Sequence, residues 1–171
     1  MNNVLFLSGV LMSPEKREEL RLPLHFISFA ITDGQMYTTH GKVDSFVAKG
    51  LRPHGNSVVY GGLYVLEDYH FHIRTLDAMY LCSKSALGQN HSLDTRHRII
   101  DKCTLISFNT LDELNRLQYK ELDTIPVEMY VGNTNHPDLT KRILRRHPYN
   151  HRIVNGVHEK YFLQELRGGQ T

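Results

Sequence analysis

The stretch VVYGGLYVLEDYHFHIRTLDAMYL, residues 58–81, changes its hydrophobic period partway along and so decides how this region folds. Its first part, SVVYGGLYVL, is the clearest strand in the sequence. Side chains on a strand alternate between two faces, which here carry Val58, Tyr60 and Gly62 on one side and Val59, Gly61 and Leu63 on the other. The Gly61-Gly62 pair predicts a bulge or a close approach of another backbone.

The second part of the stretch, FHIRTLDAMYL, has the spacing of an amphipathic helix. Ile73, Leu76 and Tyr80 recur at i, i+3 and i+7, which places them on one stripe of a helix. Asp77 lies three residues before Tyr80, so the two side chains are neighbours on the helix surface. The segment therefore predicts a strand that leads into a helix with Asp77 and Tyr80 side by side.

The rest of the chain mixes strands and helices without a regular βαβ alternation. A buried strand in NNVLFLSGVL precedes a short helix over about residues 14–20, with Ser13 as its cap and Pro14 in its first turn. Further strands are predicted in LHFISFAI, followed by a TDGQ turn, in RIIDKCTLISF and in IPVEMYVGN, with a helical turn in TLDELNRLQ and a terminal helix in YNHRIVNGVHEKYFLQEL. Residues 36–56 are predicted to be loops and short strands, and residues 82–97 a long polar connection. We expect an α+β fold and one domain over residues 1–171.

Composition excludes several classes of protein. Hydrophobic residues make up 40% of the 171 residues and charged residues 22%, which is typical of a folded domain rather than a disordered chain. A net charge of +2 is too small to indicate nucleic-acid binding by itself. No apolar run is long enough for a membrane span, and no basic residue precedes the apolar N-terminal run, so we expect neither membrane insertion nor a secretory signal. Cys82 and Cys103 predict free thiols in a reducing compartment, hence a cytoplasmic location.

Three segments of the chain resemble the gamma-glutamylcyclotransferase-like family, which includes gamma-glutamylamine cyclotransferases. FLSGVLMSPEKREEL is similar to the family's opening strand, Tyr-Gly-Ser/Thr-Leu loop and short helix; Gly9 and Leu11 match, whereas Ser8 and Val10 depart from the pattern. VVYGGLYVLEDYHFHIRTLDAMYL resembles the family's Val-x-Gly-x-Leu-Tyr strand followed by Leu-Asp-x-x-Glu-Gly. It matches at Gly61, Leu63, Tyr64, Leu76 and Asp77, but has Tyr80 for Glu and Leu81 for Gly. VEMYVG and the C-terminal segment resemble the family's last strand and helix.

This resemblance implies a small mixed β-barrel with flanking helices and a site at the first loop. In the family, backbone amides of that loop hold the amino-acid head of a gamma-glutamyl compound. The glutamate then acts as general acid and base while the substrate's own amine attacks its gamma-carbonyl, which releases 5-oxoproline. The corresponding positions here are Ser8, Gly9, Val10 and Leu11 in the loop and Tyr80 at the place of the glutamate.

A tyrosine at the place of that glutamate can donate a hydrogen bond, but it is a poor base at neutral pH. A phenol has a reference pKa near 10, so it is protonated at pH 7. Loss of a positioned acid–base group typically costs about a hundred- to ten-thousand-fold in rate. Asp77 on the adjacent turn is the candidate for a replacement acid, although an Asp early in a helix also has a structural role at the helix dipole. Backbone amides of the Gly9 turn would still bind anions whatever its side chains are.

Other charged residues offer weaker candidates. Positive charge for a carboxylate or phosphate can come from Arg74, Arg96 and Arg98, and we predict that Arg74 binds the ligand. Glu67, Asp68 and Glu128 are carboxylates that we expect to face water. His70 and His72 would share a strand face, and His147 and His151 are one helical turn apart with Pro148 between them, but neither pair has further ligands at zinc spacing, so no metal is expected.

Three functions remain open from the sequence. The first is binding of a small ligand, amino-acid-like or phosphate-containing, in the barrel pocket without cyclotransferase chemistry and without a cofactor. The second is an active cyclotransferase that uses Asp77 or another acid. The third is an interaction module that docks a protein partner through the basic residues 141–152, since a nucleic-acid partner is not expected.

Overall fold

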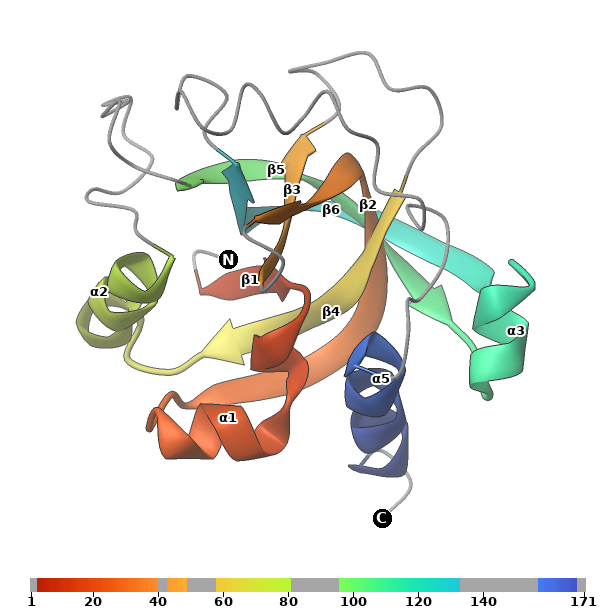
Figure 1. Ribbon diagram of the computed structural model, residues 1–171, viewed down its shortest axis with the longest axis horizontal. Coiled ribbons are helices and arrows are strands. Elements are labelled where there is room, and N and C mark those ends of the chain that lie inside the picture. The colour runs from red at the N-terminus through yellow and green to blue at the C-terminus, as the bar shows by residue number, and fades with distance from the viewer. Residues whose placement is uncertain (1–2, 40–42, 49–57, 81–95, 133–156, 169–171) are drawn as a thin grey trace.

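A computed structural model describes residues 3–39, 43–48, 58–80, 96–132 and 157–168, and its centre is a closed five-stranded barrel (Figure 1). The strand order is β3-β2-β4-β1-β6-β5, and an additional β2–β5 pairing closes the ring. β1 pairs in parallel with β6, and every other pairing is antiparallel. β3 extends from β2 outside the closed ring.

The strands are β1 (Val4–Leu7), β2 (Leu24–Thr39), β3 (Val43–Ala48), β4 (Val58–Leu66), β5 (Arg96–Ser107) and β6 (Lys120–Gly132). The helices are the 3₁₀ turn η1 (Val10–Met12), α1 (Pro14–Glu19), α2 (Tyr69–Met79), α3 (Leu111–Asn115) and α5 (Val157–Gly168). The helices lie around the outside of the barrel (Figure 1). None of the helices in the described ranges has the length and apolar character required to cross a bilayer.

The strands β1 and β4 are buried on both faces, which explains their nearly continuous apolar sequences. Val4 and Phe6 of β1 point into the barrel and pack against apolar side chains from the other strands. Leu5 and Leu7 point outward and pack with residues of the helices. A strand covered on both sides needs apolar residues at every position, as in the buried strands of α/β sheets. The period-2 pattern of the sequence therefore describes the geometry of these strands, but not an exposed face.

Glycine is required at position 61 by the contact between β1 and β4. A Cβ atom at Gly61 would lie 2.4 Å from the carbonyl oxygen of Leu7 and 2.7 Å from Cζ of Phe6. The close backbone approach that the glycine pair predicts is thus present at Gly61. The register of β1 and β4 is unbroken there, so the second alternative, a bulge, does not occur. The irregularity in this sheet lies in β2, between Phe26 and Ser28.

The helix starts follow the predicted capping chemistry. The Ser13 hydroxyl accepts a hydrogen bond from the Lys16 amide at 3.4 Å, and Pro14 opens α1. Thr110 caps α3 in the same way, with its hydroxyl 3.2 Å from the Glu113 amide. The predictions of a helix near residues 14–20 and of a helical turn within 110–118 are confirmed.

Some boundaries differ from those the sequence predicts. TDGQ is not a turn: Thr32 and Asp33 pair with β4, and Gly34 and Gln35 pair with β3 inside the long strand β2. Cross-strand pairing on one or both sides outweighs the local turn preference of Asp and Gly there. β6 begins at Lys120, earlier than expected, because it forms a hairpin with β5. The expected helix start at residues 149–156 and most of the 82–97 connection lie outside the described residues.

Candidate functional site

A cluster of charged and phenolic side chains joins α2 to the outer face of β5 and β6. We call it the α2 cluster; its members are Tyr69 and Asp77 of α2, Arg98 of β5, and Glu128 and Tyr130 of β6. Two carboxylates and one guanidinium thus lie on the outer side of the barrel beneath one helix. The register of β5 and β6 explains the meeting of two members, because Arg98 is the direct partner of Tyr130 across the two strands.

Asp77 is held by two partners within the α2 cluster. The Tyr130 hydroxyl donates to Oδ1 of Asp77 at 2.5 Å, and Nε of Arg98 lies 3.3 Å from the same oxygen. The Asp77 side chain is 14% exposed. Burial, together with the bond to Asp77, raises the pKa of Tyr130 above its usual value, so the phenol keeps its proton and remains a donor. The carboxylate therefore serves as the acceptor of an ion pair and a hydrogen bond.

Arg98 connects Asp77 with the second carboxylate. Its Nη1 lies 3.0 Å from Oε2 of Glu128 and also donates to the Tyr69 hydroxyl. Tyr69 in turn donates to the Glu128 carboxylate, at 2.6 and 2.7 Å from its two oxygens. Burial lowers the pKa of Arg98, but the attraction of Asp77 and its other neighbours outweighs this, and the net shift is upward. Glu128 is thus part of a network, contrary to the expectation that it faces water.

Tyr80 lies beside the α2 cluster with an aromatic ring and a guanidinium against it. It ends α2, and its ring stacks on that of Tyr130 with centroids 4.3 Å apart. The guanidinium carbon of Arg96 lies 5.2 Å from the Tyr80 ring centroid, a cation–π distance. Burial raises the pKa of Tyr80 to about 12, although the charge of Arg96 opposes the shift. The phenol is therefore protonated at neutral pH, and its ring packs against Tyr130 and Arg96.

The turn that follows β1 has the backbone geometry of a tight loop into a helix. Gly9 has φ 86°, a conformation that favours glycine, and the Met12 amide donates to the Gly9 carbonyl at 3.0 Å. Leu11 is fully buried in the core. Because the first amides of a helical turn precede any acceptor within it, those of Gly9, Val10 and Leu11 have no partner inside the turn.

The structure does not bring all predicted site residues together. The Gly9 turn starts close to Tyr130. The reason is that β1 and β6 run in parallel and pair through Phe6 and Met129, shortly before Gly9 in one strand and Tyr130 in the other. No described side-chain contact joins the turn to Asp77 or Tyr80. Arg74 is exposed on α2 and makes no described ion pair with the α2 cluster. Glu67 and Asp68 are exposed, as expected.

Apolar side chains fill the interior of the barrel. Val4, Phe6, Ala30, Val59, Leu63, Cys103, Val127, Met129 and Val131 are all buried and pack on one another. The Thr32 hydroxyl, the polar group among them, donates to the Lys102 carbonyl at 2.8 Å and lies 4.0 Å from Sδ of Met129. Burial of a polar ligand among these groups would leave its donors and acceptors unpaired. The part of the interior that the structure describes is therefore apolar, and a polar ligand pocket in the barrel stays a prediction.

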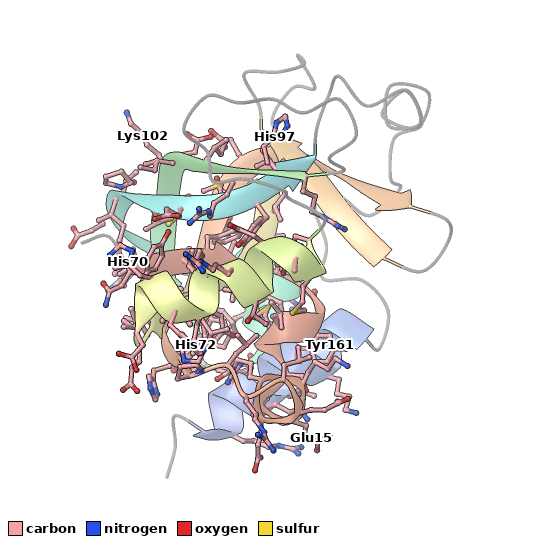
Figure 2. The ribbon with its side chains drawn as sticks, turned by 90° about the vertical axis from the view of Figure 1, so that its left-hand side faces the viewer. Glu15, His70, His72, His97, Lys102 and Tyr161 are labelled. Carbon is pink, nitrogen blue, oxygen red and sulfur yellow. The ribbon has the colours of Figure 1, made fainter. Side chains whose placement is uncertain are left out.

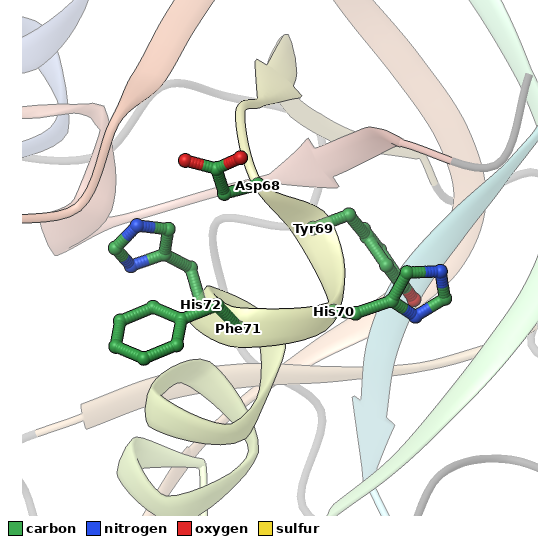
Figure 3. A pocket seen from close by; sticks show the side chains of 5 residues that line it. All are labelled: Asp68, Tyr69, His70, Phe71 and His72. Carbon is green, nitrogen blue, oxygen red and sulfur yellow. The ribbon is translucent and has the colours of Figure 1, made fainter.

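An open hollow lies at the start of α2 (Figure 3). It is lined by Asp68, Tyr69, His70, Phe71 and His72. Figure 3 shows Tyr69 and His70 on one side of the helix and Phe71 and His72 on the other. His70 and His72 thus do not share a strand face, because the segment is helical. Within the described ranges, no group of three or more His, Cys, Asp or Glu side chains is arranged to hold a metal ion.

Sequence reasoning named some members of the α2 cluster and missed others. Asp77, Arg98 and Glu128 were candidates on account of their charge, whereas Tyr69 and Tyr130 had no separate signal. Arg98 is followed by the apolar pair Ile99-Ile100 within β5, and a buried Arg requires paired acceptors. The alternation of Arg96 and Arg98 along β5 places both on one face.

Comparison with known proteins yields similarity to solved structures. No family model matches the sequence, and no curated protein matches it significantly. YkqA from Bacillus subtilis is 19% identical, with a TM-score of 0.48; the match covers 78% of this chain and 36% of YkqA. The chain therefore spans about a third of the length of YkqA.

Two further structures show comparable similarity. The Arabidopsis thaliana protein At5g39720.1 is 15% identical with a TM-score of 0.47, over 80% of this chain and 72% of that one. A protein named gamma-glutamyl cyclotransferase is 12% identical with a TM-score of 0.42, over 98% and 99% of the two chains. Identities this low transfer no activity. The strand order and the outer helices of this chain themselves make the small mixed β-barrel with flanking helices that its sequence resemblance to gamma-glutamylcyclotransferase-like proteins implies.

Proposed function

We propose that this protein is a gamma-glutamylcyclotransferase-like protein that binds a small polar or anionic ligand and does not perform the family's cyclotransferase reaction. The observation that carries the proposal is the packing of Tyr80. At the place where the resemblance expects a proton-shuttling carboxyl, a phenol with a pKa of about 12 is stacked on Tyr130 and covered by Arg96. A group in this state neither accepts a proton from an ammonium nor moves freely toward a substrate.

The contacts of Asp77 argue against its use as a replacement acid. A general acid and base must exchange a proton with the substrate, so its carboxyl has to face the reacting atoms. Oδ1 of Asp77 is already engaged by the Tyr130 hydroxyl and by Arg98. Release of Asp77 from these partners would leave the buried Arg98 with one carboxylate instead of two. We therefore assign Asp77 to the support of α2.

The proposed ligand site lies outside the barrel, between the Gly9 turn and the C-terminal end of α2. Arg96 is a buried guanidinium next to Tyr80, and its planar fork suits a carboxylate or a phosphate. Backbone amides at the Gly9 turn suit the same groups. An amino-acid-like carboxylate and a phosphate share this chemistry, so both are ligand classes to test. The proposal includes the cytoplasmic location that free thiols predict.

Two measurements on the purified protein test the proposal. Incubation with a panel of gamma-glutamyl amines should release no 5-oxoproline above the uncatalysed rate. Calorimetric titration with glutamate, 5-oxoproline and inorganic phosphate should show binding of at least one, which Arg96→Gln weakens by about tenfold, the equivalent of one charged hydrogen bond. Arg116, the residue that follows α3, carries an exposed guanidinium; Arg116→Gln is the matched control and should leave affinity unchanged.

The opposite results separate the alternatives. Release of 5-oxoproline that Asp77→Asn abolishes would make the protein an active cyclotransferase. If calorimetry detects no binding of glutamate, 5-oxoproline or inorganic phosphate, the proposal that the protein binds a carboxylate or a phosphate is contradicted. Docking of a protein partner through residues 141–152 involves residues outside the described part of the chain.

A further inference from the structure

A buried ion pair connects the C-terminal helix to the turn that follows the first strand. Nη1 of Arg17 lies 2.8 Å from Oε1 of Glu165 and donates to the carbonyl oxygen of Leu11 at 3.0 Å. Arg17 is on α1, Glu165 is on α5, and Leu11 is in η1, so one nitrogen joins three elements. Arg17 and Glu165 are 8% and 6% exposed. α5 lies on the same side of the barrel as α1 (Figures 1 and 2).

The carboxylate of Glu165 has a second donor on the barrel itself. The Tyr64 hydroxyl of β4 lies 3.2 Å from the same Oε1, and the Arg17 guanidinium stacks over the Tyr64 ring at 4.8 Å. Burial, followed by the proximity of Glu165, raises the pKa of Tyr64, so the phenol remains a donor. Arg17, Tyr64 and Glu165 therefore form a closed network, which we call the α5 bridge.

The α5 bridge reaches the residue 9–12 turn through the Leu11 carbonyl, in a turn whose Leu11 and Met12 side chains are buried in the core. The described backbone hydrogen bond inside the turn runs from the Met12 amide to Gly9, and the Leu11 carbonyl is the acceptor that Arg17 occupies. A buried charge is stable only while its partner is present. Removal of the Glu165 charge would leave the guanidinium uncompensated, and Arg17 would move toward water and release the Leu11 carbonyl.

We propose that the α5 bridge makes α5 and the residue 9–12 turn one conformational unit, so that the C-terminal helix sets the geometry of the turn. Arg17 and Glu165 are positioning residues in this device. Displacement of α5, by whatever agent, opens the turn and redirects its amides, while the barrel stays closed. This device operates in the free protein and does not depend on the proposed ligand.

Hydrogen exchange of individual backbone amides by NMR tests the coupling in the full chain. Glu165→Gln keeps the size of the side chain but removes its charge. We expect the Met12 amide to exchange about tenfold faster, a change within the usual range for coupled sites. Amides of β5, a barrel strand that supplies no member of the α5 bridge, should keep their exchange rates. Because coupling is reciprocal, Arg17→Gln should also speed exchange of the amides around Glu165 in α5.

Control variants distinguish coupling from a general loss of stability. Glu19→Gln removes the partner of Lys16 in an exposed pair on the same helix α1, at 3.4 Å, and should change no exchange rate at Met12. Tyr64→Phe removes one donor but retains the ion pair and should give a smaller acceleration at both Met12 and α5. If Glu165→Gln lowers the stability of the whole protein, exchange will accelerate everywhere, and the coupling is then judged from Tyr64→Phe. Acceleration at the Met12 amide that does not exceed the acceleration of the β5 amides in both variants would overturn the proposal.

Discussion

Tyr80 and Asp77 lie three residues apart at the end of α2 and make different contacts with the barrel. The Tyr80 ring is stacked on Tyr130, and the Arg96 guanidinium lies against it. Asp77, three residues earlier, is directed to Tyr130 and Arg98. The two residues were predicted to be neighbours on the helix. They differ in role because Asp77 forms polar contacts with the barrel, whereas Tyr80 forms ring contacts.

Asp77→Asn should destabilise the protein by about 3 kcal/mol. Removal of one partner of a buried ion pair costs about 3–5 kcal/mol, and the retained contact of Arg98 with Glu128 favours the lower end. Urea unfolding followed by circular dichroism measures the change. Asp112→Asn removes the partner of Arg116 in an exposed pair and should change stability by less than about 0.5 kcal/mol. Equal effects of the two variants would contradict the assignment of Asp77 to the support of α2.

The raised pKa of Tyr80 predicts a loss of stability at alkaline pH. Between pH 10 and pH 12 the unfolded chain releases the Tyr80 proton while the folded protein retains it. The unfolded state binds fewer protons in this window, so the free energy of unfolding falls as pH rises. Tyr80→Phe should flatten this part of the curve, as measured by urea unfolding at a series of pH values. An identical slope in the variant would show that Tyr80 titrates normally.

At the scale of elements, the molecule depends on close contacts between neighbouring strands and on the caps of its helices. β1 and β4 approach so closely at Gly61 that no side chain fits, whereas Gly62 faces the aromatic rings of Phe26 and Tyr64 outside the barrel. The two glycines are adjacent in sequence but meet different kinds of neighbour. Their substitutions should therefore have different costs.

Gly61→Ala should lower the free energy of unfolding by more than Gly62→Ala. The new methyl at position 61 would lie 2.4 Å from a backbone carbonyl, which cannot move without a shift of β1 against β4. Overpacking of this kind costs about 1–3 kcal/mol. At position 62 the nearest atom is Cε2 of the Tyr64 ring at 3.0 Å, so a smaller displacement relieves the contact. Thermal unfolding of the two variants gives the comparison, and a larger cost at position 62 would contradict it.

At the scale of the whole molecule, the β2–β5 pairing closes the barrel around an apolar interior. Helices on the outside then bury the outward faces of β1 and β4. In the described ranges, the α2 cluster, the Gly9 turn and the α5 bridge lie on the outer side of the barrel. None of these groups reaches the interior in the described part of the chain.

Cys103 should therefore report the opening of the barrel. Its thiol is 1% exposed inside the barrel, and burial raises its pKa to about 12, so almost no thiolate is present at neutral pH. In a Cys82→Ser background, modification by an aromatic disulfide reagent should be slow in the native protein and complete on unfolding. Its rate should rise with urea in parallel with the unfolding curve. Rapid modification in buffer without urea would show that the interior is accessible.

The sequence by itself determined the local structure of much of this protein. Hydrophobic period identified the strand through Gly61 and the helix through Asp77, and the capping residue Ser13 marked a helix start. These signals act between residues close in the chain. Only the tertiary structure decided the TDGQ segment, where pairing with β3 and β4 overrides turn preference. It also decided the partners of each charge: Asp77 meets Tyr130 across 53 residues, and Arg17 meets Glu165 across nearly the whole chain. The physical reason is that a buried charge must find its partner wherever closure of the barrel places one, and no local pattern records that place.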